Sequence, residues 1–122
     1  MTGITQELAA FCADLTYDAL PSKVIERAKL LILDTAGIII RARHDAESTP
    51  SLMASVKRLG LTDGQCSVFG DNVAYAPPAA ALVNGILAHS LDFDDTHAMA
   101  SLHSSAPIVP AALAAAELSG AS

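Results

Sequence analysis

Apolar residues recur at intervals of three and four positions along most of the 122-residue chain. This spacing is typical of amphipathic α-helices. It predicts a first helix over residues 4–15 and, after a break at residues 17–21, a second helix that begins at Pro21 and Ser22 and continues to Ile40. The apolar face of the second helix is predicted to comprise Val24, Ile25, Ala28, Leu31, Ile32, Thr35 and Ala36.

The rest of the pattern also favours helices. Residues 41–50 are predicted to form a loop and residues 51–59 a third helix, because Gly60 is suited to the position just after a helix end. A short extended piece is expected at 66–69. Proline is tolerated in the first turn, so Pro77-Pro78 predicts a fourth helix to about residue 90. A loop over 92–105 and a last helix over 107–118, with Pro110 in its first turn, complete an all-α fold.

Composition and charge narrow the class of protein. The aromatic content of 4% and the many alanines favour closely packed helices. The charged fraction of 16% is below the roughly 25% typical of soluble domains, so a larger parent protein or an oligomer is expected to cover part of the surface. Every Lys and Arg lies between Lys23 and Arg58, while six acids follow Leu59. Nucleic acid is excluded as a partner, because phosphate binding needs Lys and Arg.

Location and redox state follow from the same sequence. The N-terminus has no basic stretch of the kind that opens a signal peptide. The longest apolar run, near residues 38–40, is interrupted by charges and is too short to span a membrane. Cys12 and Cys66 are far apart and lack metal-ligand spacing, so both are expected to be buried, reduced thiols. A cytoplasmic protein with no membrane contact is expected.

The candidate chemistry is concentrated between Leu91 and His103. Asp92, Asp94 and Asp95 fall within four residues, and His89, His97 and His103 are three of the four histidines of the chain. Close carboxylates repel each other, so a half-buried cluster requires cations, a metal or N–H donors. Histidine changes charge near neutral pH, and mixtures of Asp and His therefore suit proton transfer.

Several interpretations of this stretch remain open from the residues alone. It can be a solvated acidic loop whose aspartates cap the neighbouring helices, or a metal site, although no spacing matches a known metal signature. Asp92-x-Asp94-x-Thr96 matches the nucleophile motif of haloacid-dehalogenase-type phosphatases, which must follow a buried strand, and residues 84–90 fit a strand poorly. Asp92-x-Asp94-Asp95 matches the acid motif of class II terpene cyclases.

Three longer blocks carry a resemblance to a known family. They are Leu20-Pro21-x-x-Val24-x-x-x-Ala28-Lys29-x-x-x-Leu33-Asp34-Thr35-x-Gly37, then Ala79-Ala80-x-Leu82-Val83-Asn84-Gly85-x-Leu87-Ala88-His89-Ser90-Leu91-Asp92-Phe93-Asp94-Asp95-Thr96-His97, and finally His103-Ser104-Ser105-Ala106-Pro107-Ile108-Val109-Pro110-Ala111-Ala112-Leu113-Ala114. The sequence resembles the MmgE/PrpD family, whose members include 2-methylcitrate dehydratase, cis-aconitate decarboxylase and iminodisuccinate epimerase. The resemblance implies a large helical domain, a smaller α/β lid and a homodimer. Residues 1–122 would form part of the helical domain, without the lid.

The resemblance also implies an activity and a site. It implies a lyase or isomerase that moves a proton next to a carboxylate of a small polycarboxylate, as 2-methylcitrate dehydratase does, without cofactor or metal. His103, Asp92 and Thr96 match active-site positions: His103 for acid–base or carboxylate-binding work, Asp92 to orient a histidine or bind a hydroxyl, and Thr96 to donate to a carboxylate. His97 and His89 are expected to bind substrate, with His97 a rival to His103. Asp94 and Asp95 are expected to be structural, and His44 a surface residue in a loop.

The distribution of Lys and Arg indicates that the site is incomplete within this chain. A polycarboxylate substrate needs positive groups, and residues 59–122 contain no Lys or Arg. Lys29 or Arg41 can lend charge, but the resemblance points to Lys, Arg and a second His beyond residue 122. The chain alone is therefore expected to be inactive. The alternatives are a non-catalytic helical fragment or oligomerisation module and, second, the phosphatase-like protein.

Overall fold

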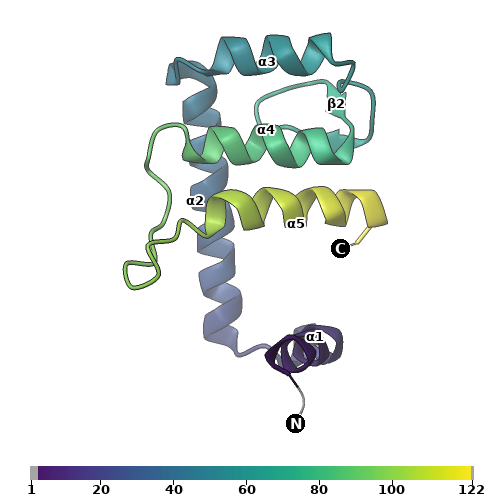
Figure 1. The fold of residues 1–122 in the computed structure, drawn as a ribbon, viewed down its shortest axis with the longest axis vertical. Coiled ribbons are helices and arrows are strands. Elements are labelled where there is room, and N and C mark those ends of the chain that lie inside the picture. The colour runs from purple at the N-terminus through teal and green to yellow at the C-terminus, as the bar shows by residue number, and fades with distance from the viewer. Residues whose placement is uncertain (1–2, 122) are drawn as a thin grey trace. The chain divides into compact units, whose positions relative to one another are not determined.

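The computed structural model describes residues 3–121 and is mainly helical, as predicted (Figure 1). The chain divides into two compact units, Met1–Leu30 and Leu31–Ser122. No helix of the described residues is both long and apolar enough to cross a membrane. The elements are α1 (Ile4–Asp14), a 3-10 turn η1 (Tyr17–Ala19), α2 (Ser22–Asp45), α3 (Thr49–Arg58), β1 (Cys66–Ser67), β2 (Ala74–Tyr75), α4 (Pro77–His89) and α5 (Ser105–Ser119).

The first unit contains α1, η1 and the beginning of α2. The predicted first helix is confirmed, but none of its residues is buried, and Ile4, Leu8 and Phe11 are exposed. Cys12 is an exposed free thiol for the same reason, so the prediction that both cysteines are buried is wrong for Cys12. The apolar side chains Ile4, Leu8 and Phe11 of α1 are therefore not buried by other residues of the first unit.

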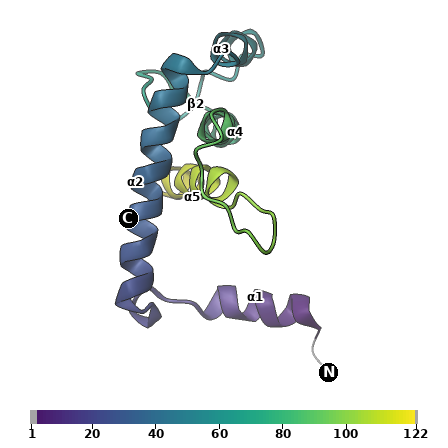
Figure 2. The same ribbon diagram turned by 90° about the vertical axis from the view of Figure 1, so that its left-hand side faces the viewer.

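The second unit is a layered set of helices. Its short helices α3, α4 and α5 lie crosswise to the C-terminal half of α2, with α4 and α5 side by side (Figures 1 and 2). Of the face predicted for α2, Thr35 is buried, whereas Val24, Ala28 and Ile32 are exposed. The other buried residues of α2 were not part of the predicted face and are Ile38, Ile39 and Ala42. Small side chains let the helices approach closely and form one core, made of Ile39, Ala42, Ala46, Val56, Cys66, Val68, Tyr75, Ala79, Ala80, Val83, Leu87, Ala88, Ala106 and Ala114.

A glycine of α4 lies against the backbone of α5 near a proline. A Cβ atom added at Gly85 would lie 3.3 Å from the carbonyl oxygen of Ala106. Pro110 is buried inside α5 and has no N–H to donate to that carbonyl. The prediction that Pro110 lies in the first turn is wrong, because α5 begins at Ser105. The proline is accommodated through its buried packing, and the Ala106 carbonyl faces α4 instead.

The loop predicted at residues 41–50 is largely helical. α2 continues to Asp45, and α3 begins at Thr49. Ala42 is buried, while Arg41 and Asp45 form an ion pair one turn apart on the exposed side. The polar residues that suggested a loop are thus the outer face of the helix. His44 is exposed as predicted, but it belongs to α2 rather than to a loop.

A small two-stranded sheet lies between α3 and α4. The extended piece predicted at 66–69 forms β1, which pairs antiparallel with β2. The intervening loop is held by Asp71, whose Oδ2 accepts hydrogen bonds from Arg43 Nη2 (2.8 Å) and Tyr75 Oη (2.7 Å). Behind β1, burial, followed by the nearby charge of Glu117, raises the pKa of the Cys66 thiol. The buried Cys66 matches the prediction for that residue.

The hydrogen bonds that Asp71 accepts from Arg43 and Tyr75 predict losses of stability at both low and high pH. Burial raises the pKa of Asp71, but hydrogen bonds from Tyr75 and Arg43 outweigh it and leave the pKa below its ordinary 3.8. Stability from Asp71 is therefore present above pH 3.8 and lost as the pH falls through the lower folded value. Burial and the bond to Asp71 raise the pKa of Tyr75 from 10.0 to about 12. Its contribution is present below pH 10.0 and lost as the pH rises towards about 12.

Denaturant unfolding across the pH range measures both losses. In Tyr75→Phe the alkaline loss should disappear and the acid loss should shrink, because one donor to Asp71 is gone. Tyr17→Phe, a change at an exposed tyrosine, should keep the wild-type pH dependence. Identical pH profiles for wild type and Tyr75→Phe would contradict the proposed network.

Candidate acid–base site at the ends of α4 and α5

The acidic stretch forms the connection between α4 and α5. α4 ends at His89, and the N–H of Asp92 donates to the His89 carbonyl oxygen at 3.1 Å. Asp92 has φ of 56°, in the left-handed region that aspartate enters more readily than most side chains. The chain turns back at this point. Asp94 is thereby brought next to the last turn of α4.

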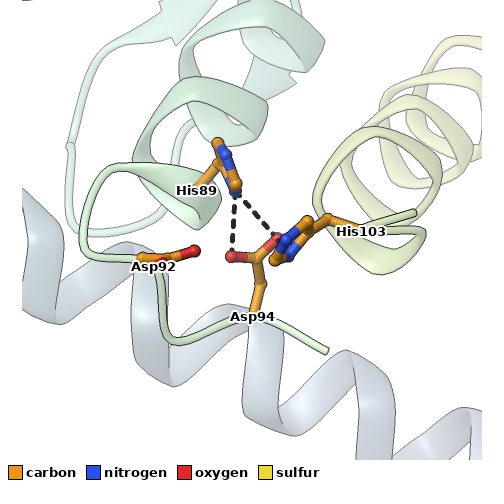
Figure 3. A group of neighbouring side chains, drawn as sticks. All are labelled: His89, Asp92, Asp94 and His103. Carbon is orange, nitrogen blue, oxygen red and sulfur yellow. Dashed lines mark hydrogen bonds and ion pairs between the residues drawn. The ribbon is translucent and has the colours of Figure 1, made fainter. Parts of the chain in front are cut away.

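Asp94 lies between two histidines. Its side chain is 2% exposed, and its two carboxylate oxygens lie 3.0 and 3.1 Å from Nδ1 of His89 (Figure 3). Nδ1 of His103 lies 3.2 Å from Oδ2 of Asp94, but at an angle outside hydrogen-bond geometry, so this buried nitrogen has no hydrogen-bond partner. The two rings meet edge to face with centroids 4.8 Å apart. We refer to these residues as the His89–Asp94–His103 cluster.

The cluster orients both imidazoles. The group that Nδ1 meets decides which nitrogen carries the proton, and here both Nδ1 atoms face one carboxylate. Nε2 is the nitrogen of each ring that does not face Asp94. Sequence reasoning gave the orienting role to Asp92 and a structural one to Asp94. It missed Asp94 because its approach to His89 depends on the left-handed turn at Asp92, which spacing does not reveal.

The other predicted site residues divide into two groups. Ligand atoms of His89, Asp92, Asp94 and His103 all lie within 4.8 Å of one another. Thr96 is exposed on the connection between α4 and α5. His97 forms a backbone bridge with Leu102 and accepts the Ala100 N–H at Nδ1 (3.2 Å). The structure thus brings His89, Asp92 and His103 together without His97, and the roles of Thr96 and His97 stay predictions.

Asp95 caps α5. Its Oδ1 accepts the N–H of Ser105, the first residue of the helix, at 3.0 Å. The helix N-terminus leaves such donors unpaired, and a carboxylate there also interacts favourably with the helix dipole. The capping role predicted for this acidic pair is therefore confirmed for Asp95. Because His103 lies two residues before the start of α5, the cap also fixes the beginning of the helix beside the cluster.

Asp95→Ala should lower the free energy of unfolding by about 0.5–2 kcal/mol, the usual cost of losing a helix cap. Urea denaturation of both proteins measures the difference. Asp63→Ala removes an exposed aspartate from a loop and should change stability by less than about 0.5 kcal/mol. An equal loss in the two variants would show that the bond to Ser105 contributes no stability.

Both histidines of the cluster line a groove of about 520 Å³ between α4 and α5. Its wall is mostly apolar and includes no Lys or Arg among the described residues that line it. A separate hollow is lined by Arg41 and Phe93, and Arg41 is paired with Asp45. The other residues that line the groove are Ala81, Leu82, Gly85, Ile86, Ala106 and Pro107.

The phosphatase interpretation fails on the element before Asp92. Its motif requires a buried strand that ends at the first aspartate. The segment that leads into Asp92 is instead helix α4, and the strands in the described part of the chain are β1 and β2 alone. Asp92 follows a helix end and is exposed, so it lacks the setting of that nucleophile.

Comparison with known proteins identifies the family of the chain. Residues 6–122 match the MmgE/PrpD N-terminal domain, and the chain belongs to the MmgE/PrpD family. A cis-aconitate decarboxylase-like protein, oryM, of Aspergillus oryzae is 36% identical over 94% of this chain and 23% of the relative. The cis-aconitate decarboxylases of Aspergillus terreus and Homo sapiens are 33% and 32% identical, each over 96% of this chain and 24% of the relative. The chain spans about a quarter of the length of these relatives.

Proposed function

We propose that this chain supplies the acid–base part of a lyase or isomerase site that moves a proton at a carbon next to a carboxylate. The observation that carries the proposal is the His89–Asp94–His103 cluster at the edge of the groove between α4 and α5. The names of the relatives favour decarboxylation of cis-aconitate as the reaction to test first. Dehydration of 2-methylcitrate is the second candidate reaction.

In this proposal, His103 exchanges the proton through Nε2. Asp94 holds its Nδ1 side and stabilises the imidazolium that forms when the ring accepts a proton. Asp92 is exposed beside the cluster and can bind a substrate hydroxyl, while Thr96 can donate to a carboxylate oxygen. His89 shares Asp94 and lines the same groove, which supports a substrate-binding role.

The proposed reaction requires positive groups that residues 59–122 do not contain. The proton next to a carboxylate becomes acidic enough only when positive groups or N–H donors stabilise the developing negative charge. Residues 59–122 contain no Lys or Arg, so we propose that the cations come from elsewhere, with Arg41 as one contributor. Exposed apolar side chains such as Leu82 and Ile108 support a homodimer. The free cysteines Cys12 and Cys66 support a cytoplasmic location.

A chimera tests the proposal. The chain replaces the matching N-terminal quarter of the Aspergillus terreus cis-aconitate decarboxylase, and carbon dioxide release from cis-aconitate is followed. Turnover by the folded chimera is the expected result, and a parallel assay uses 2-methylcitrate. A folded chimera that turns over neither compound would contradict the proposal. The isolated chain, assayed alongside, is expected to be inactive, because residues 59–122 contain no Lys or Arg to bind the substrate carboxylates.

The second candidate is a non-catalytic helical module that associates with other chains. The uncovered apolar side chains of α1 and α5 favour it. It predicts a folded dimer in sedimentation experiments, with no turnover in the chimera and no rise in melting temperature on addition of cis-aconitate. Turnover that depends on His103 would exclude it.

A further inference from the structure

We propose that the His89–Asp94–His103 cluster, together with Asp92, binds a divalent cation of the zinc type. Two imidazoles and two carboxylates place one ligand atom each within 4.8 Å of all the others. Figure 3 shows the four side chains converging on one space from the end of α4, the following turn and the segment just before α5. No sequence spacing indicates this site, because the turn at Asp92 and the beginning of α5 bring the ligands together.

The separations of the ligand atoms fit a small cation. Zinc bonds to nitrogen and oxygen are about 2.0–2.2 Å long, and tetrahedral ligands at that radius lie about 3.3–3.6 Å apart. Nδ1 of His89 and Nδ1 of His103 lie 3.0 and 3.2 Å from oxygens of Asp94. These pairs need to open by only a few tenths of an ångström. The widest separation within the group, 4.8 Å, can close through the exposed side chains of His89 and Asp92.

One nitrogen of the cluster has an unused lone pair or proton. Nδ1 of His103 is buried and makes no hydrogen bond, although it faces Asp94. A buried polar atom without a partner destabilises the folded state. A cation between His103 and Asp94 would give this nitrogen a ligand bond and would also neutralise the buried Asp94 carboxylate. Mixed imidazole and carboxylate ligands suit zinc better than magnesium or calcium, which prefer oxygen alone.

The surrounding charge also favours a cation. From Leu59 to the end of the sequence there are six acids and no Lys or Arg. Ion pairs with protein cations therefore do not compete for Asp92 and Asp94 in this part of the chain. An excess of acidic residues around a site favours the approach of cations.

Zinc occupancy would inhibit proton transfer, a consequence that rests on the proposed function. An imidazole bound to the metal through Nδ1 keeps its proton on Nε2 and so cannot act as a base through Nε2. The cation would thus compete with the proposed chemistry. The binding itself is independent of any substrate.

Calorimetric titration of Zn²⁺ into the purified chain tests the site. Cys12→Ser serves as the background, because an exposed thiol is itself a zinc ligand. One Zn²⁺ per chain is expected to bind with micromolar affinity and to raise the melting temperature, while Mg²⁺ binds far more weakly. His89→Ala should weaken Zn²⁺ binding at least tenfold, since it removes one of two nitrogen ligands. His44→Ala removes an exposed histidine of α2 and should leave the affinity unchanged.

Two variants test whether the Zn²⁺ ligands are those proposed. His89 is half exposed, so His89→Ala should fold, and circular dichroism checks that it does. Asp94→Asn is a second variant and should also lose Zn²⁺ binding. Absence of Zn²⁺ binding, equal affinity in His89→Ala, or Mg²⁺ binding as tight as Zn²⁺ would each overturn the proposal. Because no substrate is present, these failures are distinct from failure of the proposed enzyme activity.

Discussion

His103→Ala is expected to reduce turnover of cis-aconitate by the chimera at least a hundredfold. A positioned acid or base contributes about 10²–10⁴-fold to the rate of such proton transfers. His103 lines the groove, and its Nδ1 atom lies 3.2 Å from the buried Asp94 carboxylate. Alanine removes the group that exchanges the proton but leaves the groove wall in place. The main effect should therefore be on kcat rather than on KM.

Steady-state kinetics on matched variants test this expectation. His44→Ala should keep the rate of the unmodified chimera, because His44 is an exposed residue of α2. His97→Ala tests the rival histidine. If the rate falls a hundredfold in His97→Ala and not in His103→Ala, the acid–base role belongs to the outer loop. Equal melting temperatures in all variants are needed for the comparison.

Asn84→Leu is expected to lower the free energy of unfolding by about 2–3 kcal/mol. Asn84 is buried on α4 and bonds to the backbone around β1 twice: Oδ1 accepts the N–H of Phe69 at 3.0 Å, and Nδ2 donates to the carbonyl oxygen of Ser67 at 2.9 Å. Leucine has nearly the same shape, so little cavity forms. The expected loss reflects two backbone groups left without partners, each worth about 1–3 kcal/mol when buried.

Urea denaturation of Asn84→Leu beside Asn72→Leu measures the loss. Asn72 is an exposed asparagine of the loop between β1 and β2, so its replacement should change stability by less than about 0.5 kcal/mol. Equal stability of the two variants would mean that the link from α4 to β1 is not needed. Lower stability in both would point to the loop itself.

The helices were predictable because their signals are local. The capping glycines Gly60 and Gly120 both have positive φ, as expected for residues just after a helix. The predictions of secondary structure were wrong where tertiary contacts determine the local conformation. Arg41–Asp45 is helical because Ala42 packs in the core, and Pro110 is held inside α5 by burial. Neither fact is visible in the sequence, where a run of charges favours a loop and a proline favours a helix start.

The site was predictable in its residue types but not in its geometry. The density of Asp and His between Leu91 and His103 pointed to the segment that contains Asp92, Asp94 and His103 of the cluster. Which carboxylate meets which imidazole depends on one left-handed residue, Asp92, and on where α5 begins. The sequence pattern could not distinguish Asp94, which is buried between two rings, from Asp95, which caps a helix.

The absence of a side chain at Gly85 determines how closely the rings of His89 and His103 approach each other. It is one helical turn before His89 on α4, and the Ala106 carbonyl rests against it from the first turn of α5, just after His103. A side chain at this position would wedge the two helices apart by a few tenths of an ångström. The ring separation, now 4.8 Å between centroids, would widen with it. The spacing of the two histidines therefore depends on Gly85, the residue of this contact that has no side chain.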